Sequence, residues 1–131
     1  MRLATLRLAL LPLLVAAAAC RRDPAPAPAS ALPPEFARVA ASTPYVRGVV
    51  VEEVGAPGSA RFLVRGAAGA GRHEAAIVRV DPDSLLRWSD GTRASVADVR
   101  VGRSLSVWVN GPETRSLPPQ VTGSAILIDR D

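Results

Sequence analysis

The N-terminal leader limits how much of this 131-residue chain can form a folded domain. Arg2 and Arg7 introduce a run of twelve uncharged residues, Leu8 to Ala19, which ends at the only cysteine, Cys20. A short positive start followed by a brief apolar stretch is the layout of a secretory signal peptide. A membrane-spanning helix needs about 20 apolar residues, so we expect residues 1–19 to direct export and then to be removed.

The residues before the cysteine, Ala17-Ala18-Ala19-Cys20, resemble the bacterial lipobox. The resemblance implies cleavage in front of Cys20, diacylation of its thiol and attachment of the mature chain to a membrane. A lone cysteine has no disulfide partner in its own chain, and two acyl chains hold a protein stably at a bilayer. Ala17 stands where a lipobox usually has Leu, so an ordinary cleavage that releases a secreted protein remains an alternative.

The segment after the cysteine, residues 20–44, is rich in Pro and Ala. Alternating Pro and Ala favour the extended polyproline conformation, which makes a semi-rigid spacer. Glu35 to Ala41 follows two prolines and has room for one or two helical turns, because Pro suits the first turn of a helix. We expect a lipid-anchored tether without a binding role, followed by one small domain at 45–131.

The charge of the expected domain is close to neutral. The whole chain carries a net charge of +4, but from Tyr45 onward there are 11 Arg and 10 Asp plus Glu. Proteins that bind nucleic acid gather their basic residues on one face, whereas these arginines are spread singly along the sequence. We therefore expect no nucleic-acid partner.

Short Val-rich runs separated by Gly, Pro and Asp predict an all-β domain. Asp90-Gly91 predicts a small accessory hairpin within 83–94, with 85–88 as its first strand, and Ser95 to Asp98 predicts one capped turn of helix. Five strands are too few for an immunoglobulin-like sandwich and suit a small five-stranded OB-like barrel, the oligonucleotide/oligosaccharide-binding type. The five principal strands are expected at 45–54, 59–65, 73–81, 104–110 and 124–129.

Alternation of side chains along these strands predicts which residues enter the barrel. In the clearest strand, 104–110, Leu105 and Val107 face inward and Trp108 faces outward. The segment 113–123, with two adjacent prolines, is expected to cross one end of the barrel as an irregular loop.

The block from Asp98 to Ile128 resembles the C-terminal half of the YobA-like bacterial proteins. The matching residues run in the family's order: Gly102, Val107-Trp108, Gly111, Ser116, Pro118 and Gln120. Members are small exported domains, often lipoproteins, of unassigned function. The resemblance implies a barrel in the cell envelope and brings no reaction with it.

The outward face of the 104–110 strand offers a candidate binding surface. Trp108 and the nearby loop residues Arg115, Ser116 and Gln120 could together form a platform for an envelope protein, a peptide or a glycan, since aromatic and Arg side chains are enriched at recognition surfaces. The alternative is that Trp108 is covered, either by that loop or by the hairpin that carries Trp88.

Signs of catalysis are few. The only histidine is His73, and a metal site needs three or four ligands, so we expect no metal and no cofactor. Ser116 lies near Glu113, but a nucleophilic serine also needs a positioned base, and His73 is distant in sequence. We expect a non-catalytic binding or structural module on a membrane-anchored lipoprotein. The alternative is a hydrolase or metal-dependent enzyme, secreted or in the envelope.

Overall fold

The computed structural model describes residues 32–130. The expected signal peptide, Cys20 and most of the Pro/Ala-rich linker lie outside the described residues. Within them the chain forms one short helix, six strands and one 3₁₀ turn. The elements are α1 (Pro34–Ala40), β1 (Val46–Glu53), β2 (Arg61–Arg65), β3 (Ala75–Arg79), β4 (Leu85–Trp88), η1 (Val96–Asp98), β5 (Ser104–Val109) and β6 (Gln120–Ile128).

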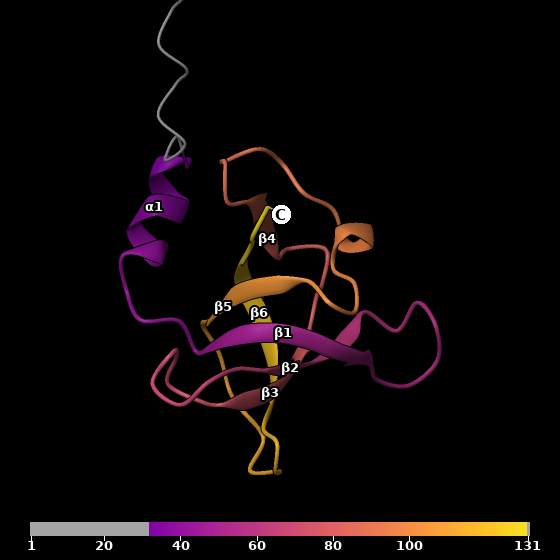
Figure 1. Ribbon diagram of the computed structural model, residues 1–131. Coiled ribbons are helices and arrows are strands. Elements are labelled where there is room, and N and C mark those ends of the chain that lie inside the picture. Colours follow the sequence, from indigo (N-terminus) through magenta and orange to yellow (C-terminus); the bar gives the residue numbers. More distant parts are fainter. Residues whose placement is uncertain (1–31, 131) are drawn as a thin grey trace, which may run out of the picture.

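Five of the strands close into a barrel (Figure 1). β1 pairs antiparallel with both β2 and β5, β2 pairs with β3, and β5 pairs with β6. A short parallel pairing between β3 and β6 closes the ring. The prediction of a small all-β, five-stranded barrel is confirmed.

In β2 and β3 every second residue is buried, as the alternation predicts. In β5 both faces are covered, so residues 105–108 are all buried. Leu105, Val107, Ile126 and Ile128 are almost completely buried. Burial of each such aliphatic side chain stabilises the fold by about 1.5–3 kcal/mol. The main core is formed mostly by Val, Ile, Leu and Phe side chains from all five barrel strands.

β1 and β2 approach so closely that only glycine fits at their crossing. A Cβ on Gly48 would overlap the carbonyl of Arg65, and a Cβ on Gly66 would overlap the carbonyl of Arg47. The strands can bend around one another here because both positions lack a side chain.

Helix α1 packs on the outside of the barrel and belongs to the folded unit. Phe36 is 1% exposed and meets Trp108 edge to face, with ring centroids 6.1 Å apart. Trp108 Nε1 also donates a hydrogen bond to the carbonyl of Ser42 at 2.9 Å. The folded unit therefore starts ahead of the expected boundary at residue 45.

Two segments differ from the sequence-based expectation. The turn at Asp90-Gly91 forms, but its return is a single bridge between Arg87 and Arg93, and β4 pairs in parallel with β6. β6 itself begins at Gln120 and thus includes the end of the expected irregular loop. Gln120 belongs to the strand because it pairs with β3. The local sequence gives no sign of this pairing. The predicted helical turn forms as η1, where Asp98 accepts a hydrogen bond from the amide of Ser95 at 2.8 Å.

Candidate functional site

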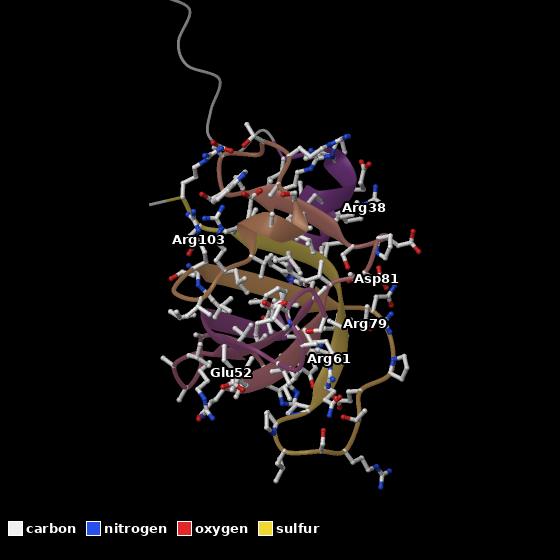
Figure 2. The ribbon with its side chains drawn as sticks, turned by 90° about the vertical axis from the view of Figure 1, so that its right-hand side faces the viewer. Arg38, Glu52, Arg61, Arg79, Asp81 and Arg103 are labelled. Carbon is white, nitrogen blue, oxygen red and sulfur yellow. The ribbon has the colours of Figure 1, made fainter. Side chains whose placement is uncertain are left out.

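A polar groove of about 530 Å³ lies on the outer face of β2 and β3. One wall comes from the end of the β1–β2 connection and the other from the β5–β6 connection. Figure 2 shows Arg61 and Arg79 close together on this side of the barrel. The lining includes Ser59, Arg61, Ile77, Arg79, Thr114 and Gln120.

The register of three strands places the two arginines side by side. Arg61 is the partner of Arg79 across β2 and β3, and Arg79 is the partner of Thr122 across β3 and β6. Directly opposed residues of a sheet share one face. Like charges in such a position repel each other, so this arrangement favours a negative group between them.

No carboxylate within residues 32–130 pairs with either guanidinium. Arg61 Nη2 donates to Gln120 Oε1 at 2.8 Å. Asp81 follows Arg79 by two residues (Figure 2), but its Oδ1 accepts a hydrogen bond from the amide of Asp83 at 2.9 Å in the next turn. The charged side chains that line the groove are therefore both positive.

The β5–β6 loop is held by Glu113, which stands between two groove-lining residues. The hydroxyl of Tyr45 donates to Glu113 Oε2, and His73 Nε2 lies 3.9 Å from the same oxygen. The imidazole of His73 stacks on the Tyr45 ring with centroids 4.2 Å apart. Burial, and then the hydrogen bond and negative charge of Glu113, raise the pKa of Tyr45. The phenol thus remains a donor that fixes Glu113.

The structure brings together only part of the proposed platform: the hydroxyl of Thr114 contacts the Ser116 hydroxyl at 2.7 Å and accepts a hydrogen bond from the amide of Gln120 at 2.9 Å. Gln120 lies in the groove, while Arg115 and Ser116 are exposed on the neighbouring loop. Trp108 faces outward as predicted, but its side chain is only 7% exposed. Its cover is helix α1, not the loop or the Trp88 hairpin. An exposed platform on Trp108 is therefore not present while α1 is docked.

Sequence reasoning missed the two arginines that give the groove its charge. Arg61 and Arg79 stand on the outward faces of predicted strands, separated by a loop. Their positions on those faces were readable from the alternation, but their proximity follows from the pairing of β2 with β3.

The fold brings together part of a hydrolytic arrangement. His73 and Glu113 are neighbours, although they are distant in sequence. Ser116 Oγ instead contacts Thr114 Oγ1 at 2.7 Å and donates to the carbonyl of Pro118 at 2.9 Å. Within the described residues, Ser116 therefore makes no hydrogen bond to the imidazole of His73. In the same part of the chain, no three His, Cys, Asp or Glu side chains gather where they could hold a metal ion.

Comparison of the chain with family models, with curated proteins and with solved structures found no match. The YobA-like resemblance therefore stays a prediction. In the described part of the chain, no helix has the length and apolar character needed to cross a bilayer.

Proposed function

We propose that this protein is a lipid-anchored lipoprotein of the bacterial envelope whose barrel is a non-catalytic module for binding an anionic ligand. The observation that carries the proposal is the pair Arg61 and Arg79, which face one groove without a carboxylate partner in residues 32–130. Guanidinium groups bind carboxylates and phosphates through paired, charge-assisted hydrogen bonds.

The ligand class follows from the fold and the charge. Barrels of this type bind oligonucleotides or oligosaccharides over strands 2 and 3 and the adjoining loops, which is where the groove lies. An exported domain with a nearly balanced charge is poorly suited to nucleic acid. An acidic glycan fits both the position and the positive charge of the groove.

Titration calorimetry with a uronic-acid oligosaccharide, against a neutral oligosaccharide of equal length, tests the proposal. We expect the acidic sugar alone to bind, with an affinity that falls as salt is added. Arg79→Gln should weaken binding by about tenfold, the loss expected for one charge-assisted contact. Arg38→Gln on the exposed face of α1 is the matched control. Equal affinity for both sugars, or no effect of Arg79→Gln, would rule out the groove as the binding site.

The proposed anchor rests on Cys20, which lies outside the described residues. Detergent phase partitioning of the protein expressed in bacteria, compared with a Cys20→Ser variant, tests it. We expect the wild-type protein to enter the detergent phase and the variant to remain in the aqueous phase. Equal partitioning of the two proteins would exclude the lipid anchor and favour a secreted protein.

A second candidate function is hydrolysis, and the proximity of His73 to Glu113 is what favours it. A fluorophosphonate probe would label an activated serine. Labelling of Ser116 that disappears in a His73→Ala variant would support this candidate, and an unlabelled protein would leave the binding module as the better account.

A further inference from the structure

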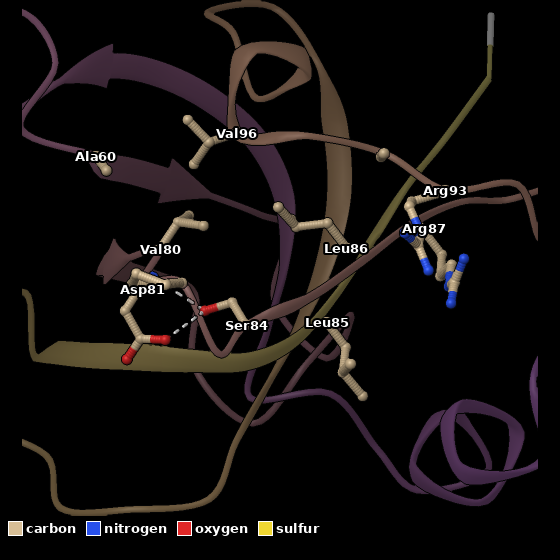
Figure 3. Close-up of a pocket in the computed structure, with 11 residues that line it drawn as sticks. Ala60, Val80, Asp81, Ser84, Leu85, Leu86, Arg87, Arg93 and Val96 are labelled. Carbon is tan, nitrogen blue, oxygen red and sulfur yellow. Dashed lines mark hydrogen bonds between the residues drawn. The ribbon is translucent and has the colours of Figure 1, made fainter.

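A second cavity, separate from the polar groove, opens beside β6. One edge of β6 is shared by two parallel partners: residues 120–122 pair with β3, and residues 125–128 pair with β4. The cavity, of about 640 Å³, is lined by residues at the end of β3, along β4 and in η1 (Figure 3). Pockets that bind small molecules have volumes of about 300–1,000 Å³, so its size suits a small organic ligand.

The walls of this cavity are largely apolar. Val80, Leu85, Leu86 and Val96 all line it, and Leu86 projects into its centre (Figure 3). Leu85 is 41% exposed and Val96 is 44% exposed. Single exposed apolar residues are ordinary, but Val96 lies in the same lining as Val80 and Leu86 and forms with them an apolar wall that an apolar ligand would cover. Leu85 leaves the opposite face of β4 from Leu86 and points away from this wall (Figure 3).

One end of the cavity is positively charged. Arg87 and Arg93 are partners in an isolated β-bridge, and their guanidinium groups lie together at one end of the lining (Figure 3). Neither has a carboxylate partner within residues 32–130. The nearby carboxylate of Asp90 is already paired with Arg130 at 2.9 Å.

The carboxylate at the other end of the cavity, Asp81, does not neutralise the positive charge of Arg87 and Arg93. Asp81 lies across the cavity from the two arginines (Figure 3) and accepts a hydrogen bond from the amide of Asp83 at 2.9 Å, while the hydroxyl of Ser84 lies 3.4 Å from the same carboxylate oxygen. The cavity thus combines an apolar wall with a cationic end, a combination that matches a molecule with an alkyl chain and an anionic head.

We propose that this cavity binds a single alkyl chain that ends in a carboxylate, as in a free fatty acid. The chain lies against Val80, Leu86 and Val96, and the carboxylate binds between Arg87 and Arg93. The site is independent of the proposed glycan groove, since the two cavities share no lining residue.

The test uses decanoate below its micelle concentration, with acetate and 1-decanol as the head-only and chain-only probes. Binding is followed by calorimetry and by amide shifts in NMR spectra. We expect decanoate to bind more tightly than either partial probe and to shift the amides of Leu86 and Val96. Arg87→Gln combined with Arg93→Gln should weaken decanoate binding by about tenfold or more, because two charge-assisted contacts are lost.

Val96→Gln tests the apolar wall separately, and the exposed position of Val96 makes the change tolerable for folding. It should weaken decanoate binding and leave the circular dichroism spectrum unchanged. Arg38→Gln on α1 should bind as the wild type does. No binding of decanoate, equal binding of decanoate and 1-decanol, or shifts confined to the groove around Ile77 and Gln120 would each overturn the proposal.

Discussion

Tyr45 fixes the position of the β5–β6 loop beside the polar groove. Tyr45 is 3% exposed, and its hydroxyl donates to Glu113. Burial and the neighbouring negative charge both disfavour the phenolate, which is why the pKa of Tyr45 is raised. Because the buried phenol must stay protonated in the folded protein, the free energy of unfolding depends on pH.

Tyr45 is the only tyrosine in the chain, so phenolate absorbance reports on it alone. We expect the folded protein to titrate well above the usual tyrosine pKa of about 10, and Glu113→Gln to lower that pKa. Because the folded pKa is raised, this contribution to stability is complete below pH of about 10 and is lost as the pH rises towards the folded pKa. Ionisation at the ordinary pKa with the fold intact would show that Glu113 is not bonded to the phenol.

Gly48 and Gly66 allow the close approach of β1 and β2, because a side chain at either position would overlap the facing backbone. We expect Gly66→Ala to destabilise the protein by about 1–3 kcal/mol or more, because the new methyl group would displace the backbone at Arg47. Gly111→Ala is the control, since open space surrounds that position, and its effect should stay within about 0.5 kcal/mol. Urea unfolding measures both, and equal midpoints would contradict the close crossing.

At the scale of elements, α1 shows how a short segment of the expected tether becomes structure. Phe36, Val39 and Ala40 of α1 pack against Trp108 at spacings of one helical face, and Leu32, which precedes the helix, joins the same cluster. A helix of seven residues is too short to be stable alone. Its packing against Trp108 therefore supplies most of its stability.

Phe36→Ala should release α1 and expose the indole of Trp108. The loss of stability has an upper bound of about 3–5 kcal/mol, the range for truncating a buried Phe. The expected signal is a red shift of tryptophan fluorescence that persists in a Trp88→Phe background. Arg38→Ala, on the exposed side of the same helix, should cause no shift. An unchanged spectrum in Phe36→Ala would mean that the helix stays docked without this contact.

At the scale of the whole molecule, the barrel and its attached helix should differ in local stability. Residues from β1, β2, β3, β5 and β6 share the main core, whereas α1 contributes to a smaller cluster outside it. Regions with few buried contacts open at low free energy while the core stays closed.

Native-state hydrogen exchange checks this difference. The amide of Ala41, bonded to Ala37 at 3.1 Å, should exchange by local opening of α1. The amide of Tyr45, bonded across strands to Val107 at 2.7 Å, should exchange only with global unfolding. Equal exchange free energies for these two amides would show that helix and barrel unfold as one unit.

The sequence by itself determined the barrel, because inward side chains must alternate along each strand if they are to be buried. Leu105, Val107 and the outward position of Trp108 follow from that rule alone. Tertiary structure decided what each outward side chain meets. Arg61 reaches Gln120 across 59 positions of sequence, and Glu113 lies beside His73. Outward residues carry no burial pattern, so only the register and closure of the sheet bring them together.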